Sequence, residues 1–541
     1  MGVDYCIRSN NIFTADGSDL CSGSVLVSGT RIVNVVPPGI EKEYIDSNTE
    51  IIDAIEGLVM PGLIDAHTHF FSGALAYSDH VCCEIEQSVS EDDCVRIIKE
   101  YEMSHPDEER IRGRGWFITN WGTDILPTKD SLDALIPDKP VYLMAADCHS
   151  FWLNSAALRE CGITKDTEVS MGYIAKDENG EPTGMLLEME ACSIAEKYYN
   201  SFSDEELKKI YKNFFKYTAR LGITSISEMI PGEYDDEHFK KYSFIKQMSE
   251  NGECSARLHI FPKLYDTDSF DIAREWKEKI DNDYVKISGV KGFIDGVAET
   301  YTALFLEPYS DNPKTNGIGV PAKSAEELNN SVLKANKAGF PVRIHAIGDL
   351  AVRMALDAFE FARKETGKKL ANTIEHIESI DPSDIKRFRE LDVIPSMQPI
   401  HIILDADGKI KKVGEKRIKY EWITKTLLDI CGQIAIGTDY PVVDINPFDN
   451  IYAAVTRRFF DGREASHNTY EKLSVKETLL GYTKYAAKTY SREDEIGTLK
   501  EGMLADIIIL DKNIINVSEE DIRNTKVLMT MVGGKIVHKD L

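Results

Sequence analysis

The sequence predicts an α/β protein: a (β/α)8 barrel with a small β domain built from both ends of the chain. Three observations lead to this prediction. Short apolar strands alternate with helical segments through the middle of the chain, both termini carry short β-rich segments, and several of the middle strands end in histidine, lysine or aspartate. A chain of 541 residues exceeds the usual size of one hydrophobic core, so a large domain with a smaller one, or two domains, is expected.

The β domain is predicted from the pattern of residues at the two termini. Residues 1 to about 57 carry short β-rich segments separated by turn residues. The same pattern returns at residues 495–541, where Gly533-Gly534 forms a predicted hairpin turn. Strands this short need partners, and the simplest partners are each other. We therefore expect residues 1–57 and 495–541 to form one small β-sandwich domain, with the barrel, residues 58–494, inserted between them.

The barrel is predicted from a repeated unit in which a helix precedes a strand. Ser324 and Glu327 form a capping box, and Gly339 ends the helix before a strand at 340–345. Two further units of this kind are predicted at residues 203–227 and 381–397, the helix of the second beginning at Asp381-Pro382. Candidate ligands at the C-terminal strand ends favour a (β/α)8 barrel, because such barrels keep their chemistry on that face. An open doubly wound sheet is the alternative.

From about residue 71 to 200 the alternation of helices and strands is interrupted. The segments there are marked by Trp, Gly and Pro and show weaker periodicity. We interpret them as an insertion that roofs or walls a pocket.

Charge and composition limit the classes of partner and the compartment. The chain carries 63 basic and 90 acidic residues, a net charge of −27, which repels phosphate backbones and anionic membrane surfaces. Residues 1–8 lack a basic lead followed by an apolar run, and no apolar stretch is long enough to span a bilayer. We therefore expect a cytoplasmic protein with no nucleic-acid or membrane partner, and a homodimer stays open. Ten scattered cysteines without a CxxC pair predict neither a disulfide framework nor a thiolate zinc site.

The candidate metal ligands recur in order along the chain. His67 and His69 lie in an extended segment, where alternation points both imidazoles to the same side. A His-x-His pair alone is weak evidence, because many histidines only satisfy buried hydrogen bonds. His376 and Asp439 add to it, since each ends a buried-type strand with a group able to bind a metal. With His345 included, four imidazoles and a carboxylate suit zinc, with manganese or iron less favoured.

The chain resembles the amidohydrolase superfamily, specifically its YtcJ-like (amidohydrolase 3) branch, which includes N-substituted formamide deformylases. The resemblance covers essentially the whole chain and rests on segments that match family landmarks in order. These segments are residues 61–69, 147–158, 290–296, 345–349, 374–376, 437–442 and 502–506.

The resemblance implies a metal centre of one or two ions at the mouth of a distorted (β/α)8 barrel. The implied ligands are His67, His69, Lys291, His345, His376 and Asp439. The first two histidines would hold the more buried ion and the last two the second. The lysine would bridge two ions as a carbamate formed with carbon dioxide, and the aspartate would ligate one ion and handle the proton.

Lysine can serve as a ligand only if its amine loses its charge, which a desolvated, cation-rich site promotes. Lys286 is the competing candidate, because it stands five residues earlier and would face the opposite side of an ideal strand. Family alignment favours Lys291. The alternative, in which Lys291 is an ordinary lysine paired with Asp295 beside a single metal ion, stays open.

The expected function is that of a metal-dependent amidohydrolase, a hydrolase acting on carbon–nitrogen bonds other than peptide bonds. Bound cations lower the pKa of water, which supplies an activated hydroxide, and polarise the scissile carbonyl. Asp439 would act as base and then as acid. The expected substrate is a small molecule, such as an N-substituted formamide or an N-acyl amine. Two alternatives are a deaminase or cyclic amidase on the same centre, and a metal-free binding or scaffold protein of the same fold.

Substrate-binding candidates come from the family landmarks and their neighbours. His149, Gln398 and His401 match or adjoin family positions, although hydrogen bonding in the core or in loops is the alternative for both histidines. Trp116 is a candidate wall for an apolar substrate, with buried packing as its alternative.

The chain departs from the family pattern at residues 297–303. Val-Ala-Glu-Thr-Tyr-Thr-Ala stands in place of the common Ser-x-Gly-Ser-Arg-Thr-Ala, so Tyr301 replaces an arginine. Tyr301 is therefore a candidate substrate-binding residue, and the substrate of a relative does not transfer directly. Glu299 would suit a cationic or amine-bearing substrate, with a salt bridge as the alternative.

Overall fold

The structure is a computed structural model that describes residues 2–540, apart from 124, 147–149, 170–171, 188, 266–269, 299–300 and 318–323. The chain divides into two compact units, Met1–Phe70 with Phe215–Leu541, and Phe71–Phe214. The larger unit contains both ends of the chain and every predicted metal ligand. The sequence predicts a β domain and a barrel that meet at residues 57 and 495, and both of these boundaries lie inside the larger unit. The division into these two domains therefore stays a prediction.

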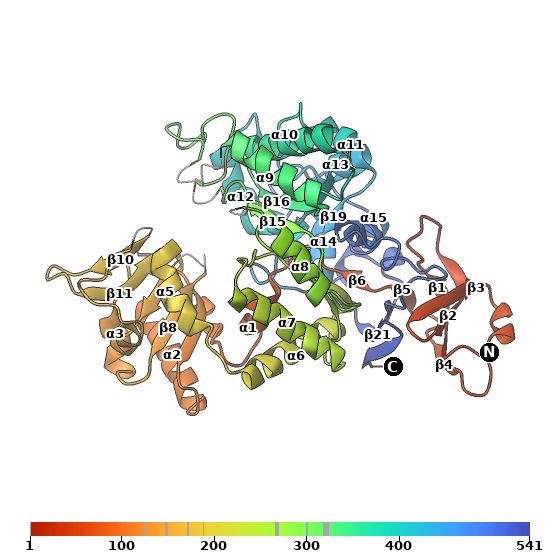
Figure 1. Ribbon diagram of the computed structural model, residues 1–541, viewed down its shortest axis with the longest axis horizontal. Helices are drawn as coiled ribbons and strands as arrows, with labels where there is room; N and C mark the ends of the chain where they lie inside the picture. Colours follow the sequence, from red (N-terminus) through yellow and green to blue (C-terminus); the bar gives the residue numbers. More distant parts are fainter. Residues whose placement is uncertain are drawn as a thin grey trace. The chain divides into compact units, whose positions relative to one another are not determined.

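Strands from the two ends of the chain share one sheet in the larger unit. Its order is β22-β21-β20-β5-β1-β2-β3, with β4 also paired to β1. Ile7, Val25, Ile507 and Met531 contribute to its apolar core. Figure 1 shows the red strands β1 to β4 and the blue strand β21 in the same part of this unit. The strands are β1 (Tyr5–Ile12), β2 (Cys21–Ser28), β3 (Arg31–Val36), β4 (Glu50–Asp53), β5 (Leu58–Pro61), β20 (Ile507–Leu510), β21 (Val527–Val532) and β22 (Lys535–Lys539).

The middle of the chain forms two parallel sheets. One has the order β14-β13-β12-β6 and the other the order β15-β16-β17-β18-β19. The predicted mixed α/β class is confirmed. The strands are β6 (Leu63–Ile64), β12 (Ile223–Glu228), β13 (Arg257–Ile260), β14 (Val285–Ile287), β15 (Val290–Phe293), β16 (Val342–Ala346), β17 (Thr373–His376), β18 (Ile394–Met397) and β19 (Ala435–Ile436).

Backbone hydrogen bonds join these two sheets at both meeting edges. The amide of Lys291 on β15 donates to the carbonyl of Pro262, just after β13, at 2.9 Å, and the amide of Ala66, after β6, donates to the carbonyl of Ile436 on β19 at 3.2 Å. β14 and β15 follow each other with only residues 288–289 between them. Taken as one bent strand, they complete a ring of eight strand positions, the (β/α)8 barrel. Because all of its strands are parallel, their C-terminal ends meet at one rim.

Helices connect the strands of this ring. α9 has the predicted capping box, since Ser324 Oγ accepts from the amide of Glu327 at 3.2 Å, and Gly339 ends the helix at a φ of 90°, which favours glycine. The helices are α7 (Asp236–Glu250), α8 (Asp271–Ile280), α9 (Ala325–Ala338), α10 (Asp349–Thr366), α11 (Ile385–Leu391), α12 (Ile402–Val413), α13 (Thr424–Cys431), α14 (Pro447–Thr456), α15 (Val475–Gly481) and α16 (Lys484–Thr489). α1 (Phe70–Ala76) and α6 (Asp204–Arg220) cross the boundaries between the units.

α11 begins later than the sequence predicts. The predicted start was Asp381-Pro382, whereas the helix begins at Ile385. The intervening residues form a turn, closed by a 2.9 Å bond from the amide of Asp384 to the carbonyl of Asp381.

The smaller unit, residues 71–214, overlaps the segment at about 71–200 that the sequence predicts to be an insertion, and it has its own sheet and core. That this segment roofs or walls a pocket stays a prediction. The sheet order is β10-β11-β9-β8-β7, and Trp116 and Trp152 lie in its apolar core. Its elements are α2 (Glu91–Ser104), β7 (Ile111–Trp116), α3 (Lys129–Leu135), β8 (Val141–Ala145), β9 (Ser150–Leu153), α4 (Ser155–Glu160), β10 (Tyr173–Lys176), β11 (Pro182–Leu187) and α5 (Met189–Tyr199). Across the described parts of both units, no helix has the length and apolar character that a membrane span requires.

Candidate metal centre

The predicted metal ligands lie at the C-terminal ends of the barrel strands. His67 and His69 follow β6, Lys291 is on β15, His345 is on β16, His376 ends β17, and Asp439 follows β19. The strands of a parallel barrel are buried on both faces and therefore apolar, so polar side chains collect where the strands end. This topology brings together residues that are far apart in the sequence.

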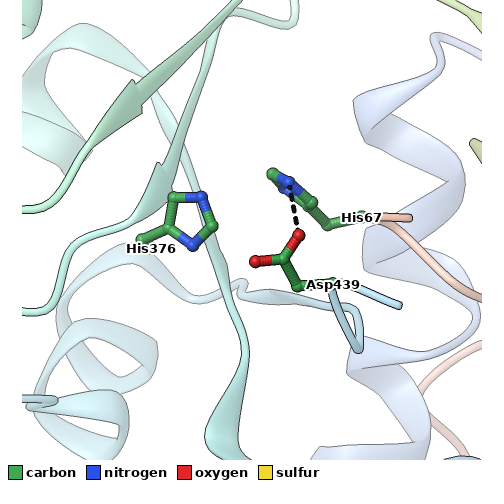
Figure 2. Close-up of side chains that lie close together, drawn as sticks. All are labelled: His67, His376 and Asp439. Atoms are coloured by element: carbon green, nitrogen blue, oxygen red, sulfur yellow. Dashed lines mark ion pairs between the residues drawn. The ribbon is translucent and has the colours of Figure 1, made fainter. Parts of the chain in front are cut away.

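Three of these side chains, His67, His376 and Asp439, form a compact group (Figure 2). They are buried, and their candidate ligand atoms all lie within 4.8 Å of one another. His67 Nε2 lies 3.4 Å from Asp439 Oδ1. Two ligands of a tetrahedral zinc ion lie about 3.4 Å apart when each bond is about 2.1 Å long. The separation therefore fits two ligands that share one ion.

Two further histidines border this group. His69 Nε2 lies 2.8 Å from Asp439 Oδ1. The ring centroid of His345 lies 4.5 Å from that of His376, which lies 4.7 Å from that of His67. The four predicted histidines and the aspartate are therefore one continuous cluster, which we call the metal cluster.

Two members of the metal cluster have left-handed backbone conformations. The φ angle is 71° at His376 and 70° at Asp439. Such a conformation costs a non-glycine residue on the order of 1–3 kcal/mol and collects at functional sites, where the surroundings hold it in place. Here the amide of Asp439 donates to the carbonyl of His67 at 2.7 Å, which fixes the turn against the first ligand segment.

Glu375 sets the orientation of His67. Its Oε2 accepts from His67 Nδ1 at 2.7 Å, and its Oε1 accepts from Arg343 Nε at 2.6 Å. Burial opposes the charge of Glu375, but Arg343 and His67 outweigh burial and hold the pKa of Glu375 well below its usual value. Because a carboxylate can only accept, Nδ1 of His67 carries the proton, and Nε2 presents its lone pair to the metal cluster.

Burial also favours the uncharged form of three imidazoles of the cluster, those of His67, His345 and His376. It lowers the pKa of His67 to about 4 and that of His345 to about 3, and it lowers the pKa of His376 well below the ordinary value. Burial alone would raise the pKa of Asp439, but His67 and the neighbouring imidazoles hold it well below its usual value. Neutral imidazoles and an ionised carboxylate are the forms that bind metal ions.

Lys291 is a buried amine beside the cluster. Its Nζ has no hydrogen-bond partner among the described residues, and burial lowers its pKa to about 8. Its charge is among the causes that lower the pKa values of His67 and His345, which places the amine near both. The competing Lys286 is only partly buried, on β14, where it stands in register with His259.

The metal cluster fits a divalent cation. Nδ1 of His69, Nδ1 of His376 and Nζ of Lys291 are buried polar atoms without a hydrogen-bond partner in the described part of the chain. Buried polar atoms are normally satisfied, so such a concentration at one place indicates a ligand. Imidazole nitrogens with a carboxylate oxygen form a zinc-type donor set.

Gln398 and His401 lie at the same rim, after β18. His401 Nε2 is 3.7 Å from Asp439 Oδ2, and its ring stacks at 6.1 Å from that of His376. Both polar atoms of the Gln398 amide are buried and have no partner among the residues described. The positions of Gln398 and His401 suit contact with a substrate, and the role of both residues in substrate binding stays a prediction.

Tyr301 is engaged in local contacts. Its hydroxyl donates to Asp311 Oδ2 at 3.1 Å, and Lys412 Nζ lies 3.4 Å from its ring centroid. These contacts restrain the ring, and its role toward substrate stays a prediction.

Trp116 belongs to the smaller unit. The residue is 2% exposed, and its Nε1 donates to the carbonyl of Leu143 at 3.0 Å. This is the packing role given as the alternative for Trp116, so its substrate role remains without structural support. His149 and Glu299 lie outside the described residues.

Several supporting residues were missed by reasoning from the sequence. Glu375 and Asp65 are carboxylates within otherwise apolar segments, and that contrast was a usable signal. Asp65 Oδ2 accepts from Thr438 Oγ1 at 2.7 Å, beside the turn that carries a ligand. Asn450 links the segments after β18 and β19 through two 2.8 Å hydrogen bonds. Nothing local distinguishes Asn450 from any other helical asparagine.

The family assignment rests on a match that covers most of the chain. Residues 50–538 match the model of the amidohydrolase family. The chain belongs to this family. The resemblance identified from the sequence landmarks is therefore confirmed.

Relatives in the family have diverse names. This amidohydrolase is 30% identical to "Protein LONG AFTER FAR-RED 3" of Arabidopsis thaliana, over 98% of this chain and 91% of that protein. It is 28% identical to "Putative amidohydrolase YtcJ" of Bacillus subtilis, over 92% of each. It is 26% identical to "N-substituted formamide deformylase" of Arthrobacter pascens, over 98% of this chain and 97% of that protein.

One solved structure resembles most of the amidohydrolase chain. It is an uncharacterized metal-dependent hydrolase from Pyrococcus horikoshii, 26% identical, with a TM-score of 0.79 and coverage of 95% of this chain and 99% of that chain. The chain is therefore a member of the amidohydrolase family, it resembles a metal-dependent hydrolase, and it has a buried histidine–aspartate group of the kind that holds a metal ion.

Proposed function

We propose that this amidohydrolase cleaves a carbon–nitrogen bond in a small amide, an N-substituted formamide or another N-acyl amine. The buried group of His67, His376 and Asp439 is the observation that carries the proposal. Similarity to a formamide deformylase along 98% of the chain supports the substrate class.

The residues of the site have separate tasks in this proposal. Zinc, as one or two ions, is the metal we assign to the cluster, with Lys291 carboxylated if two ions bind. When bound, zinc supplies activation of water and polarisation of the amide carbonyl. Asp439 accepts a proton on Oδ2, which lies on the side of His401, and later delivers it to the leaving nitrogen. Gln398 and His401 hold the substrate at the rim.

A substrate panel with controlled metal content tests this function. The purified protein is stripped with a chelator, reloaded with zinc, manganese or iron(II), and incubated with N-substituted formamides, N-acetyl amines and cyclic amides. We expect equal amounts of acid and amine from an acyclic amide, loss of activity on chelation, and recovery with zinc. Ammonia release without an acid product would instead identify a deaminase. Folded protein that retains no metal after reloading and converts none of these substrates would favour the metal-free binding-protein alternative.

Asp439→Asn tests the proton-handling role. The amide keeps the shape of the side chain but cannot accept a proton, so kcat should fall on the order of 10²- to 10⁴-fold while the thermal midpoint stays close to that of the wild type. Asp444→Asn is the matched control, because Asp444 is exposed and lies in the same loop. A variant at position 439 with wild-type kcat would refute the role.

A further inference from the structure

A buried ion pair lies beside the metal cluster without belonging to it. Lys409, on α12, contacts Glu378, in the segment after β17, through Nζ and Oε2. Lys409 is fully buried and Glu378 is 6% exposed. The ring centroid of Trp422 lies 4.9 Å from Lys409 Nζ. The pair is therefore held in an environment from which bulk water is removed.

Stability alone does not explain this pair. Removing two charges from water costs free energy that their mutual attraction often fails to recover, so apolar residues of similar volume would stabilise the fold at least as well. A second carboxylate, Glu421, is buried near the same lysine and accepts from Ser379 Oγ. Burial raises the pKa of Glu421 to about 8, so Glu378 is the charged partner of Lys409 at neutral pH.

His401 lies between Glu378 and the metal cluster. The carboxylate oxygen of Glu378 that does not contact Lys409, Oε1, lies 3.9 Å from His401 Nδ1. On the opposite side of the ring, His401 Nε2 lies 3.7 Å from Asp439 Oδ2. The imidazole therefore lies between two carboxylates, one held by a buried lysine and the other in the metal cluster.

The backbone around this ring is fixed independently of the ion pair. The carbonyl of Glu378 accepts from the amide of Trp422 at 2.7 Å. Asn450 accepts from the amide of Ile400 and donates to the carbonyl of Gly437, both at 2.8 Å. These bonds hold the backbone on both sides of the His401 ring, so a change in the ion pair is expected to act on the orientation of the ring and not on the course of the backbone.

We propose that Glu378 and Lys409 are positioning residues that act on the reaction through His401. The ion pair holds Glu378 against Nδ1 of the imidazole and thereby directs Nε2 toward Asp439 and the substrate. The inference rests on the proposed amide hydrolysis. If it is right, loss of the ion pair lets the ring rotate while the backbone and the metal ligands stay in place.

Substitution of Lys409 is the first test. Lys409→Met keeps an unbranched side chain of similar length but removes the charge. We expect kcat/KM per zinc-loaded molecule to fall on the order of 10- to 100-fold, because small displacements of positioned groups have effects of that size. Zinc content should stay unchanged, and Lys409→Arg, which keeps the charge, should recover part of the loss.

Arg257→Met is the matched control for a broken buried ion pair. Arg257 pairs with Asp506 at 2.7 Å, and the two side chains are 1% and 3% exposed. This control should lower the thermal midpoint without lowering kcat/KM per zinc-loaded molecule. Equal losses of kcat/KM in Arg257→Met and Lys409→Met would overturn the positioning role.

A double-mutant cycle tests the route through His401. Glu378→Gln should lower kcat/KM in the wild-type background but have no further effect in a His401→Ala background, because the group through which it acts is then gone. Losses that multiply independently in the double variant would contradict the proposal.

A crystal structure of Lys409→Met needs no substrate and therefore separates this inference from the proposed function. We expect the His401 ring to turn away from Asp439 Oδ2 while His67 and His376 keep their positions. A ring that keeps its orientation would overturn the inference even in an active amidase. A displaced ring in a protein whose wild type cleaves no amide would support positioning and contradict the substrate class.

Discussion

The charge state of the metal cluster depends on single residues behind it. Glu375, fixed by Arg343, places the proton of His67 on Nδ1 and leaves Nε2 for a metal ion. Burial lowers the pKa values of His67, His345 and His376, so these imidazoles are neutral, and it lowers the pKa of Lys291 to about 8. The site is therefore prepared for a cation before any cation binds.

Carboxylation of Lys291 is testable at the level of this residue. A neutral amine is the form that reacts with carbon dioxide, and a pKa of about 8 makes that form accessible near neutral pH. We predict that zinc-loaded wild type incubated with 13C-bicarbonate shows a carbamate carbon resonance by NMR. The resonance should be absent from Lys291→Arg, since a guanidinium stays protonated, and present in the control Lys286→Arg. A signal that survives in Lys291→Arg would refute the assignment.

Glu421 predicts a pH dependence of stability. Its pKa is raised by burial from 4.5 to about 8 in the folded protein, so the folded state holds an extra proton between these values. Its contribution to stability is fully present below pH 4.5 and is lost as the pH rises through about 8. At about 1.4 kcal/mol per pH unit, the upper limit of this loss is about 5 kcal/mol.

The Glu421→Gln variant removes this titration because the amide stays uncharged. We expect wild type and variant to have similar urea midpoints near pH 5, and the variant to be the more stable protein at pH 8.5. Comparing the two proteins at each pH cancels the titration of all other groups. Midpoints that differ by a constant amount across this range would rule out the assigned titration.

At the scale of elements, local signals were the ones that could be predicted. α9 carries its start and stop signals within its own sequence, and both are confirmed. The ligand positions also follow a local pattern, because each predicted ligand lies on a short barrel strand or in the segment just after it. The sequence predicts too early a start for α11, because a turn after Asp381 delays the helix and helix propensity alone does not show that turn.

The cap of α9 gives a prediction at this scale. Ser324→Ala removes the side-chain acceptor of the Glu327 amide, which should lower the free energy of unfolding by about 1 kcal/mol. Ser331→Ala, in the middle of the same helix, is the control and should be neutral or slightly stabilising because alanine favours helices. Thermal or urea midpoints of the two variants measure the difference. Equal effects at both positions would contradict a role for the cap.

The whole molecule explains which site features the sequence could not reveal. Glu378 and Lys409 are 31 residues apart on different elements, and no periodic pattern links them. They meet only because the barrel places the segment after β17 beside α12. Trp116 gives the opposite case, because the sequence suggests a role in substrate binding and the structure places the residue in the apolar core of the smaller unit. That packing depends on the fold of the unit and is not visible in the sequence around Trp116.

The terminal sheet and the barrel are joined by a buried contact as well as by the chain. Arg257 on β13 makes two hydrogen bonds, at 2.7 and 2.8 Å, to the carboxylate of Asp506, which immediately precedes β20. Pairs of this bidentate form are geometrically specific. The contact ties the C-terminal strands to the strand ring that carries the metal cluster.

Zinc content is the measurement that tests the central claim most directly, namely that side chains from separate barrel strands converge to hold a catalytic cation. Wild type and His376→Ala are stripped, reloaded with zinc, desalted and analysed by elemental mass spectrometry, with circular dichroism to confirm that both are folded. We predict that each wild-type chain retains at least about one zinc ion and that the His376→Ala chain retains clearly less zinc. Folded wild type that retains no zinc, or equal retention by both proteins, would contradict the account.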